Sequence, residues 1–281
     1  MLLSCSLNSS FLIYLINYTL YIKISKYIVA CNKRIVKNSI TVRGASVIND
    51  FFGKSAVGEP FQWLTFSHVV MLGLLLVSGI LLFLFRTRLT KGKSVIRYTL
   101  ALFLLSSELS LYVWYVFTGV WDPIDSLPFQ LCSISLFLSI IMLLTKSHLL
   151  FEVTYFLGIG GALQAMLTPE LAYDFPHYRY FHFFLAHIAI ILASLYMIWY
   201  ENYRPTFKSI WKAFAGLNII ALVVFFVNEA TGGNYMFLAK KPINPSLIDF
   251  LGPYPWYILS LEIVALIMFF ILYLPFMRKK N

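Results

Sequence analysis

The stretch LTFSHVVMLGLLLVSGILLFLF (64–85), together with the stretch RTRLTKGK (86–93) that follows it, decides the fold of this chain. The first stretch has no Asp, Glu, Lys or Arg and is long enough to cross roughly 30 Å of hydrocarbon as an α-helix. The second is strongly basic, and basic loops are retained on the cytoplasmic side of a membrane. The two stretches predict a helix that crosses the membrane from the outside to the cytoplasm.

Further apolar windows of similar length follow at 96–117, 128–145, 149–167, 180–200, 207–228 and 255–275. Alternate ends of these windows carry lysines and arginines, whereas the opposite loops carry most of the acids. We therefore predict an all-α fold, a polytopic membrane bundle of about seven helices. The charge bias places the start of the main body outside and the C-terminus in the cytoplasm.

The composition supports a multi-pass protein of the cell membrane. Of the 281 residues, 60 % are hydrophobic and only 12 % are charged, which is far more apolar than a water-soluble domain. The net charge of +10 is explained by the basic cytoplasmic ends, so we expect no nucleic-acid partner. The sequence leaves the oligomeric state open.

Residues 1–48 do not fit the charge pattern of the spans. They are basic, contain no acid, and hold an apolar patch at 11–22 that is too short to cross the bilayer comfortably. We interpret 1–48 as a basic N-terminal extension, peripheral or outside the core, and 49–281 as a single transmembrane domain.

Polar residues gather at the outer ends of the predicted spans. A polar side chain at membrane depth is costly unless it has a partner or lines a cavity, so each is a functional candidate. We expect one outward-facing polar pocket, although the same groups can also hold helices together by mutual hydrogen bonds. Its candidate substrate-binding residues are Gln130, Gln164, Asn234, Tyr235, Lys241 and Trp256.

Cys132 lies in LPFQLCSISLFL (127–138), where Pro128 suits the first turn of a helix. This places Cys132 about one turn inside, near the positive end of the helix dipole. A reactive thiol there needs a base, usually a histidine on a neighbouring helix. The alternative is that Cys132 is simply a small buried hydrophobic residue.

Two histidines follow in YRYFHFFLAHIAI (178–190). Their spacing of five places His182 and His187 about 140° apart on a helix, so both cannot point squarely into one pocket. His187 lies deeper between small alanines, and we predict that it is the base. His182 can orient a headgroup or face the membrane interface. No metal-binding spacing of histidines occurs, and we expect neither a metal nor a cofactor.

Two acids lie inside predicted spans. Glu108 lies in the middle of the second span, where it must be protonated, paired or part of a hydrated path. A hydrogen bond between helices and a role in proton transfer both fit this position. Glu262 lies near the start of the seventh span.

Four ordered motifs resemble the bacterial YwaF-type membrane family, which is related to vertebrate transmembrane protein 164. They are NDFFGKSAVGEPFQWLTFSHVV (49–70), LPFQLCSIS (127–135), FHFFLAHI (181–188) and NYMFLAKKPINPSLIDFLGPYPWYI (234–258). The resemblance covers about 49–275. It implies a phospholipid acyltransferase in which Cys132 is the nucleophile and a downstream histidine, His187 or His182, is the base.

The leading hypothesis is accordingly a lipid acyltransferase or transacylase whose partner is a membrane phospholipid or lyso-lipid. In this hypothesis Gln130, Asn234 or Tyr235 donates hydrogen bonds to the oxyanion, and Lys241 meets a lipid phosphate or remains a solvated loop charge. The alternative is a transporter or receptor for a small solute, with Glu108 as an intramembrane relay. Against transport, the sequence has no internal repeat.

Overall fold

The structure is a computed structural model that describes residues 50–54, 61–89, 91–242 and 247–277. The chain divides into two compact units, residues 1–51 and 52–281. The basic extension predicted at 1–48 lies outside the described residues. The seven α-helices all belong to the second unit.

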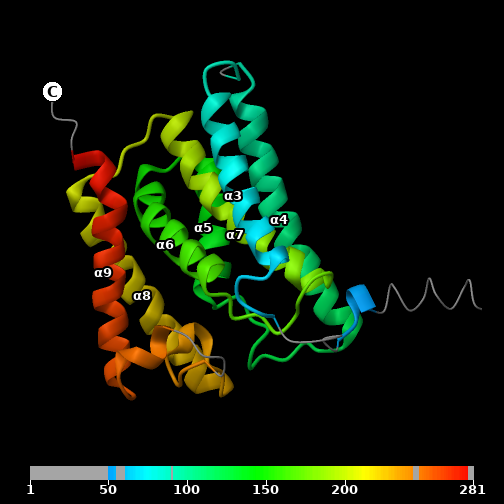
Figure 1. Ribbon diagram of the computed structural model, residues 1–281. Coiled ribbons are helices and arrows are strands. Elements are labelled where there is room, and N and C mark those ends of the chain that lie inside the picture. Colours follow the sequence, from blue (N-terminus) through cyan, green and yellow to red (C-terminus); the bar gives the residue numbers. More distant parts are fainter. Residues whose placement is uncertain (1–49, 55–60, 90, 243–246, 278–281) are drawn as a thin grey trace, which may run out of the picture. The chain divides into compact units, whose positions relative to one another are not determined.

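The described part of this unit is helical and contains no β-strand (Figure 1), which confirms the predicted all-α membrane bundle. Each of the seven predicted windows corresponds to one α-helix. These helices are α3 (Phe66–Leu84), α4 (Lys93–Thr118), α5 (Leu131–Thr145), α6 (His148–Leu167), α7 (Tyr178–Trp199), α8 (Phe207–Thr231) and α9 (Trp256–Met277).

Six of these helices are long and apolar enough to cross a membrane, and the exception is α5. With 15 residues, α5 measures about 22 Å, which is short of roughly 30 Å of hydrocarbon. The third predicted span is therefore a short helix held among longer ones.

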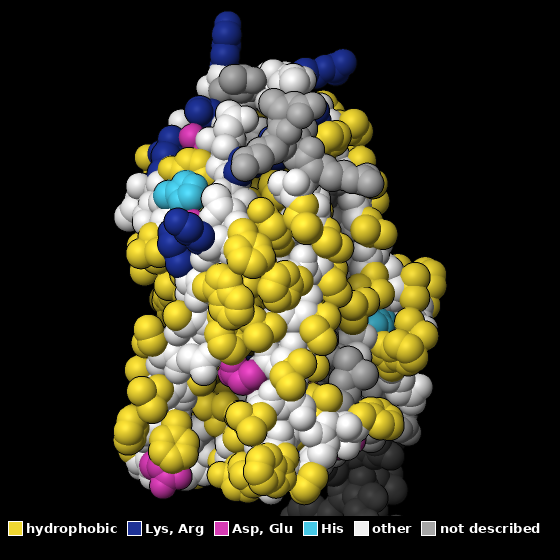
Figure 2. All heavy atoms as spheres, turned by 90° about the vertical axis from the view of Figure 1, so that its left-hand side faces the viewer, with side chains coloured by type: hydrophobic (Ala, Val, Ile, Leu, Met, Phe, Trp, Pro, Cys, Tyr) yellow, Lys and Arg dark blue, Asp and Glu magenta, His cyan; other side chains and the backbone are white. Residues whose placement is uncertain are grey.

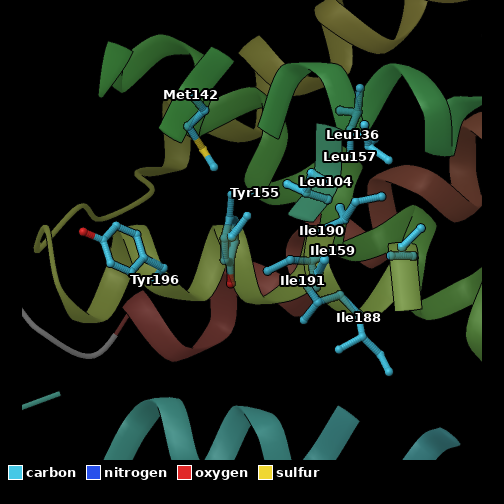
Figure 3. Packing of buried hydrophobic residues seen from close by; sticks show 14 of the residues in the cluster. Leu104, Leu136, Met142, Tyr155, Leu157, Ile159, Ile188, Ile190, Ile191 and Tyr196 are labelled. Atoms are coloured by element: carbon cyan, nitrogen blue, oxygen red, sulfur yellow. The ribbon is translucent and has the colours of Figure 1, made fainter. Parts of the chain in front are cut away.

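Helices α6 and α7 form the centre of the bundle. Helix α6 contacts α5, α7, α8 and α9, and α7 also contacts α3, α4 and α5. Figure 3 shows the core where Ile190 and Ile191 of α7 meet Leu157 of α6 and Leu136 of α5. These central helices bury residues on almost every side, whereas α3 and α9 expose most of their apolar surface to lipid.

The GIGG sequence of α6 allows three neighbouring helices to approach closely. A Cβ atom on Gly158 would lie 3.1 Å from Ile190 of α7, and one on Gly161 would lie 3.3 Å from Leu131 of α5. A Cβ atom on Gly160 would meet Met268 of α9 at 3.4 Å. Small residues at helix interfaces are typical of membrane bundles, because packing replaces the hydrophobic effect there.

Lysines and arginines gather toward one end of the bundle (Figure 2). We call this end, where Lys93, Lys146 and Arg204 lie, the basic end. The segregation agrees with the predicted cytoplasmic side, and the orientation itself stays a prediction.

The segment after α8 is rich in turns, as its glycines and prolines predict. Helix α8 ends at Gly232, whose φ of 71° is left-handed. Two 3₁₀ helices follow, η1 (Tyr235–Phe237) and η2 (Leu247–Leu251). Residues 243–246 between them lie outside the described part.

Candidate functional site

Helix α5 begins later than the sequence predicts. Gln130, with extended backbone angles of −68° and 146°, is the N-cap, and Leu131 is the first helical residue. Pro128 therefore precedes the helix and does not form its first turn. Ser126 hydrogen bonds to Asp122 and Asp125 and does not cap α5. The prediction that Cys132 lies a turn inside is wrong: it is the second helical residue, closer to the positive helix end.

The start of α5 is displaced because the hydroxyl of Tyr235 holds the preceding loop. This hydroxyl donates to the Pro123 carbonyl at 2.7 Å and accepts from the Leu127 amide at 2.9 Å. Since Tyr235 is fully buried, the loop before α5 is anchored to the segment after α8.

A cluster at the basic end sets the relative heights of α4, α5 and α7. One oxygen of Glu201 lies 3.0 Å from Lys146 Nζ, and the other lies 3.3 Å from Lys93 Nζ. The hydroxyl of Tyr196 donates to Glu201 at 3.0 Å. We call Lys93, Lys146, Tyr196 and Glu201 the Glu201 cluster.

Three predicted site residues are separated from this cluster by similar numbers of residues along the chain. Cys132 lies 14 residues before Lys146, and His187 lies 14 residues before Glu201. Glu108 lies 15 residues after Lys93, and α4 runs opposite to α5 and α7. The direct contacts between α4 and α7 pair Ser110 with Tyr178 and the Ser107 backbone with His182, so His182 rather than His187 lies level with Glu108.

The side chain of Cys132 is half-buried and faces α7. Its neighbour Leu131 contacts the Gly161 position of α6, whereas Ser133 on the other side interacts with Glu108 of α4. Because successive helical residues are 100° apart, Cys132 points between these two directions. Helix α7 contacts α4, α5 and α6 and fills that direction.

The two candidate bases lie on different sides of α7. His182 shares a face with Tyr178 and Tyr196, whose hydroxyls reach Ser110 and the Lys93 carbonyl of α4. His187 shares a face with Ser194, which lies against Gly158 of α6. The surface of α7 that α5 covers lies between the His182 face and the His187 face. Within the described residues, no hydrogen bond joins the Cys132 thiol to either ring.

The hydrogen bonds of His187 assign its tautomer. Its Nδ1 lies 2.6 Å from the Phe183 carbonyl oxygen, which only accepts, so Nδ1 carries the proton. Its Nε2 is then a bare lone pair, buried and without a hydrogen-bond partner in the described part of the chain. His182 Nε2 also lacks a well-formed hydrogen bond, although the Ser107 carbonyl interacts with the ring.

Arg179 joins Glu108 and Cys132 electrostatically, and the sequence interpretation missed it. Its guanidinium lies 5.5 Å from the centre of the Trp114 ring, and its Nε is buried with no hydrogen-bond partner among the described residues. The signal was an arginine at the outer end of an apolar window, where the charge bias disfavours cations. Glu108, only 3 % exposed, thus interacts with both Ser133 and Arg179, as the paired alternative for this acid predicts.

His177 is a second residue that the sequence interpretation missed, and its role is to cap α7. Its Nδ1 accepts from the Arg179 amide at 3.0 Å, and its Nε2 donates to the Gly53 carbonyl at 2.9 Å. Burial lowers the pKa of His177, and the neutral ring is the form that satisfies both bonds.

Two of the predicted oxyanion donors have structural partners. Asn234 accepts from the amides of Ala239 and Lys240 and donates to the Lys240 carbonyl, which closes its own loop. The Tyr235 hydroxyl is bonded to the Pro123 carbonyl and the Leu127 amide. Gln130 is different: its Oε1 accepts from the Met236 amide at 3.0 Å, and its amide nitrogen has no hydrogen bond within the described residues.

The remaining predicted residues are spread over the bundle. Gln164 donates to Thr168 on its own helix at 2.8 Å, and Glu262 accepts from Asn218 of α8 at 3.0 Å. Lys241 donates to the Asp249 carbonyl at 3.3 Å. Trp256 is exposed at the start of α9, a position typical of an interfacial aromatic residue. The structure thus joins Cys132 to Glu108 and Arg179 electrostatically and places His182 beside Ser107 of α4, whereas Glu262 and Lys241 lie outside that group.

Comparison with known proteins assigns the chain to a family. The model of the TMEM164 family matches residues 63–273, which include every helix discussed above except the last turn of α9. An uncharacterised protein of Treponema pallidum (strain Nichols) is 25 % identical over 152 residues, which are 54 % of this chain and 63 % of that protein. The chain thus covers less than two thirds of that relative's length. No solved structure matches. Since the family model matches well over half of the sequence, the chain belongs to the TMEM164 family.

Proposed function

We propose that this protein is a membrane-embedded lipid acyltransferase in which Cys132 is the nucleophile and His187 is the base. The observation that carries the proposal is that Cys132 and His187 lie on the adjacent helices α5 and α7. A salt bridge joins Lys146 to Glu201, and these two residues lie 14 positions after Cys132 and His187, respectively. The free Nε2 of His187 is the nitrogen that a general base needs.

The reaction divides into two acyl transfers. The proton of the Cys132 thiol moves to His187 Nε2, and the thiolate attacks the ester carbonyl of a phospholipid. The tetrahedral intermediate collapses, the C–O bond breaks, and the departing alkoxide takes the proton from the imidazolium as lyso-lipid leaves. An acceptor hydroxyl then gives its proton to His187 and attacks the thioester. The C–S bond breaks, and the thiolate recovers the proton.

Two groups beside the thiol are suited to stabilise the negative charge of this reaction. Arg179 interacts electrostatically with Cys132, and the Gln130 amide lies at the N-cap of the same helix. Preorganised donors of this kind lower a transition-state barrier by about 3–4 kcal/mol when well placed. Asn234 and Tyr235 are better explained as loop anchors, because their polar atoms already have partners.

The proposed lipid substrate is inferred from the surroundings of the Cys132 thiol. The thiol lies in the first turn of α5 among apolar helices, where a lipid ester is close to the headgroup level. Lys241, which also lies 5.7 Å from the Tyr257 ring centre, is the proposed phosphate contact at this end.

The test is acyl exchange between labelled phospholipid and lyso-lipid by the full-length protein in proteoliposomes. We expect Cys132→Ala to abolish exchange and His187→Gln to reduce it about 10²–10⁴-fold, the usual worth of a general base. A thioester on Cys132 should be trapped by mass spectrometry. Ser139→Ala is the matched control, since Ser139 lies two turns further along the same face of α5. Undiminished exchange by Cys132→Ala would remove the proposal.

A second candidate function is proton-coupled transport of a small solute. The observation that favours it is Glu108, a nearly fully buried acid beside Arg179 within a span. Under this alternative, Glu108→Gln abolishes solute uptake and Cys132→Ala leaves uptake unchanged. Under the acyltransferase proposal, Cys132→Ala removes the activity outright.

A further inference from the structure

The lipid-facing side of α8 and α9 carries a polar pair inside an apolar surface. Asn218 donates from Nδ2 to Glu262 Oε2 at 3.0 Å and to the Phe214 carbonyl at 3.0 Å. Asn218 lies about 16 Å along α8 from Phe207 and about 20 Å from Thr231. Glu262 lies about 9 Å along α9 from Trp256, so the pair lies inside both helices and nearer the start of α9 than its end.

Bulky apolar side chains surround this pair. Ile219, Leu222 and Phe226 of α8 and Leu259 and Ile263 of α9 are all exposed. On this side of the bundle an acidic side chain interrupts the hydrophobic surface (Figure 2). Asn218 itself is exposed and Glu262 is half-buried.

The pair is incompletely satisfied. Both hydrogens of the Asn218 amide are used, but Asn218 Oδ1 and Glu262 Oε1 have no hydrogen-bond partner among the described residues. Lipid tails offer no donor to such groups, and polar groups at this depth normally face protein or a water-filled cavity.

We propose that this face binds a second copy of the same chain in a parallel, two-fold symmetric dimer. In its neutral form the Glu262 carboxyl has an O–H donor that matches the free Asn218 Oδ1 of the other copy. The two-fold axis repeats this bond in the opposite direction, so both polar pairs are completed at once.

The equal depth of the Asn218–Glu262 pairs in two copies favours a second copy of this chain over another membrane protein as the partner. Copies inserted with the same orientation carry their Asn218–Glu262 pairs at the same depth, because the two-fold axis is parallel to the membrane normal. An unrelated helix would need its own donor at that height. The surrounding apolar residues then pack against their symmetry mates, as interhelical hydrogen bonds between spans require.

The experiment measures self-association of the full-length protein in phosphatidylcholine vesicles. Single-molecule photobleaching at falling protein-to-lipid ratios gives the dimer fraction. We expect the unmodified protein to dimerise, and Glu262→Gln, which keeps a donor, to dimerise equally. Glu262→Ala and Asn218→Ala should each weaken dimerisation by about tenfold, the worth of two interhelical hydrogen bonds.

Cysteine crosslinking locates the interface and does not require the pair to be altered. Leu222→Cys and Leu259→Cys should form disulfide-linked dimers on oxidation, whereas the equally exposed Leu102→Cys on α4 should stay at the background of the unmodified chain. Monomers at every lipid ratio, or dimers unaffected by either alanine substitution, would overturn the proposal. If the alanine variants do not fold, crosslinking at Leu102 in place of Leu222 and Leu259 would still overturn it.

Discussion

Lys146, at the C-cap of α5, and Glu201, just beyond the C-terminal end of α7, form a salt bridge of 3.0 Å between Nζ and Oε1. The same carboxylate also binds Lys93 at the start of α4. Glu201 therefore joins the ends of α4, α5 and α7, the three helices that carry Glu108, Cys132 and His187. A charge cluster at one end of the bundle thus restrains the helices of the candidate site.

The Glu201 cluster predicts a defined pH dependence of stability. Burial raises the pKa of Glu201, but hydrogen bonds from Lys146, Tyr196 and Lys93 outweigh it, so the pKa lies below its ordinary value. The stabilisation is complete above the unfolded-state pKa of about 4.3 and is lost as the pH falls through the folded-state pKa. At pH 7, Glu201→Gln should lower the free energy of unfolding by about 1–2 kcal/mol, since the lysines are about one-third exposed and partly screened.

Chemical unfolding in micelles at pH 7 and below pH 4 measures this effect. The difference between Glu201→Gln and the unmodified protein should narrow at the lower pH. Glu229→Gln, which changes an exposed acid near the end of α8, is the control and should leave the free energy of unfolding nearly unchanged. A loss for Glu201→Gln that does not vary with pH would contradict the role of the ionised carboxylate.

The approach of α6 to α7 depends on Gly158. Gly158→Ala should destabilise the bundle by about 1–3 kcal/mol, because its Cβ would lie 3.1 Å from Ile190 in a filled core. Gly79→Ala in α3 is the matched control, since no atom lies within 4 Å of its added Cβ. The control should be neutral or slightly stabilising, as alanine favours a helix. Thermal unfolding of Gly158→Ala and Gly79→Ala in the same detergent measures the difference in their stability.

Tyr235 anchors the loop that precedes α5. Removal of its hydroxyl in Tyr235→Phe leaves the Pro123 carbonyl and the Leu127 amide without their partner, at a cost of about 1–3 kcal/mol. Tyr254→Phe removes an exposed hydroxyl and should have little effect. Amide hydrogen exchange at residues 123–130 should accelerate in Tyr235→Phe alone, and equal exchange in both variants would count against the anchor.

Arg179 should affect turnover more than folding if the acyltransferase proposal holds. Loss of one charge-stabilising donor typically lowers kcat by about 10²–10³, so Arg179→Gln should show a loss of that order. Arg204→Gln, at the basic end, is the control and should keep full exchange activity. Thermal unfolding measured in parallel separates a loss of charge stabilisation from a loss of structure.

Sequence periodicity and charge predicted every long helix, because hydrophobic length and basic ends act locally along the chain. They misplaced the start of α5, since Pro128 is a local signal for a helix start that the distant Tyr235 overrides. The sequence also offered Cys132 and the two histidines as candidate site residues, which stay a prediction. It missed Arg179, because a single arginine at a span end has no partner until the helices assemble.

The amino-acid sequence by itself determined that the chain crosses a membrane repeatedly, because nothing but lipid can accommodate so many long apolar stretches. It also singled out Glu108 and His187, two polar residues that are buried in the bundle. Only the tertiary structure decided which of them meet, because Glu201 joins residues more than a hundred positions apart and thereby fixes the register between helices. Register between helices depends on contacts at their ends, and no local pattern along one helix contains that information.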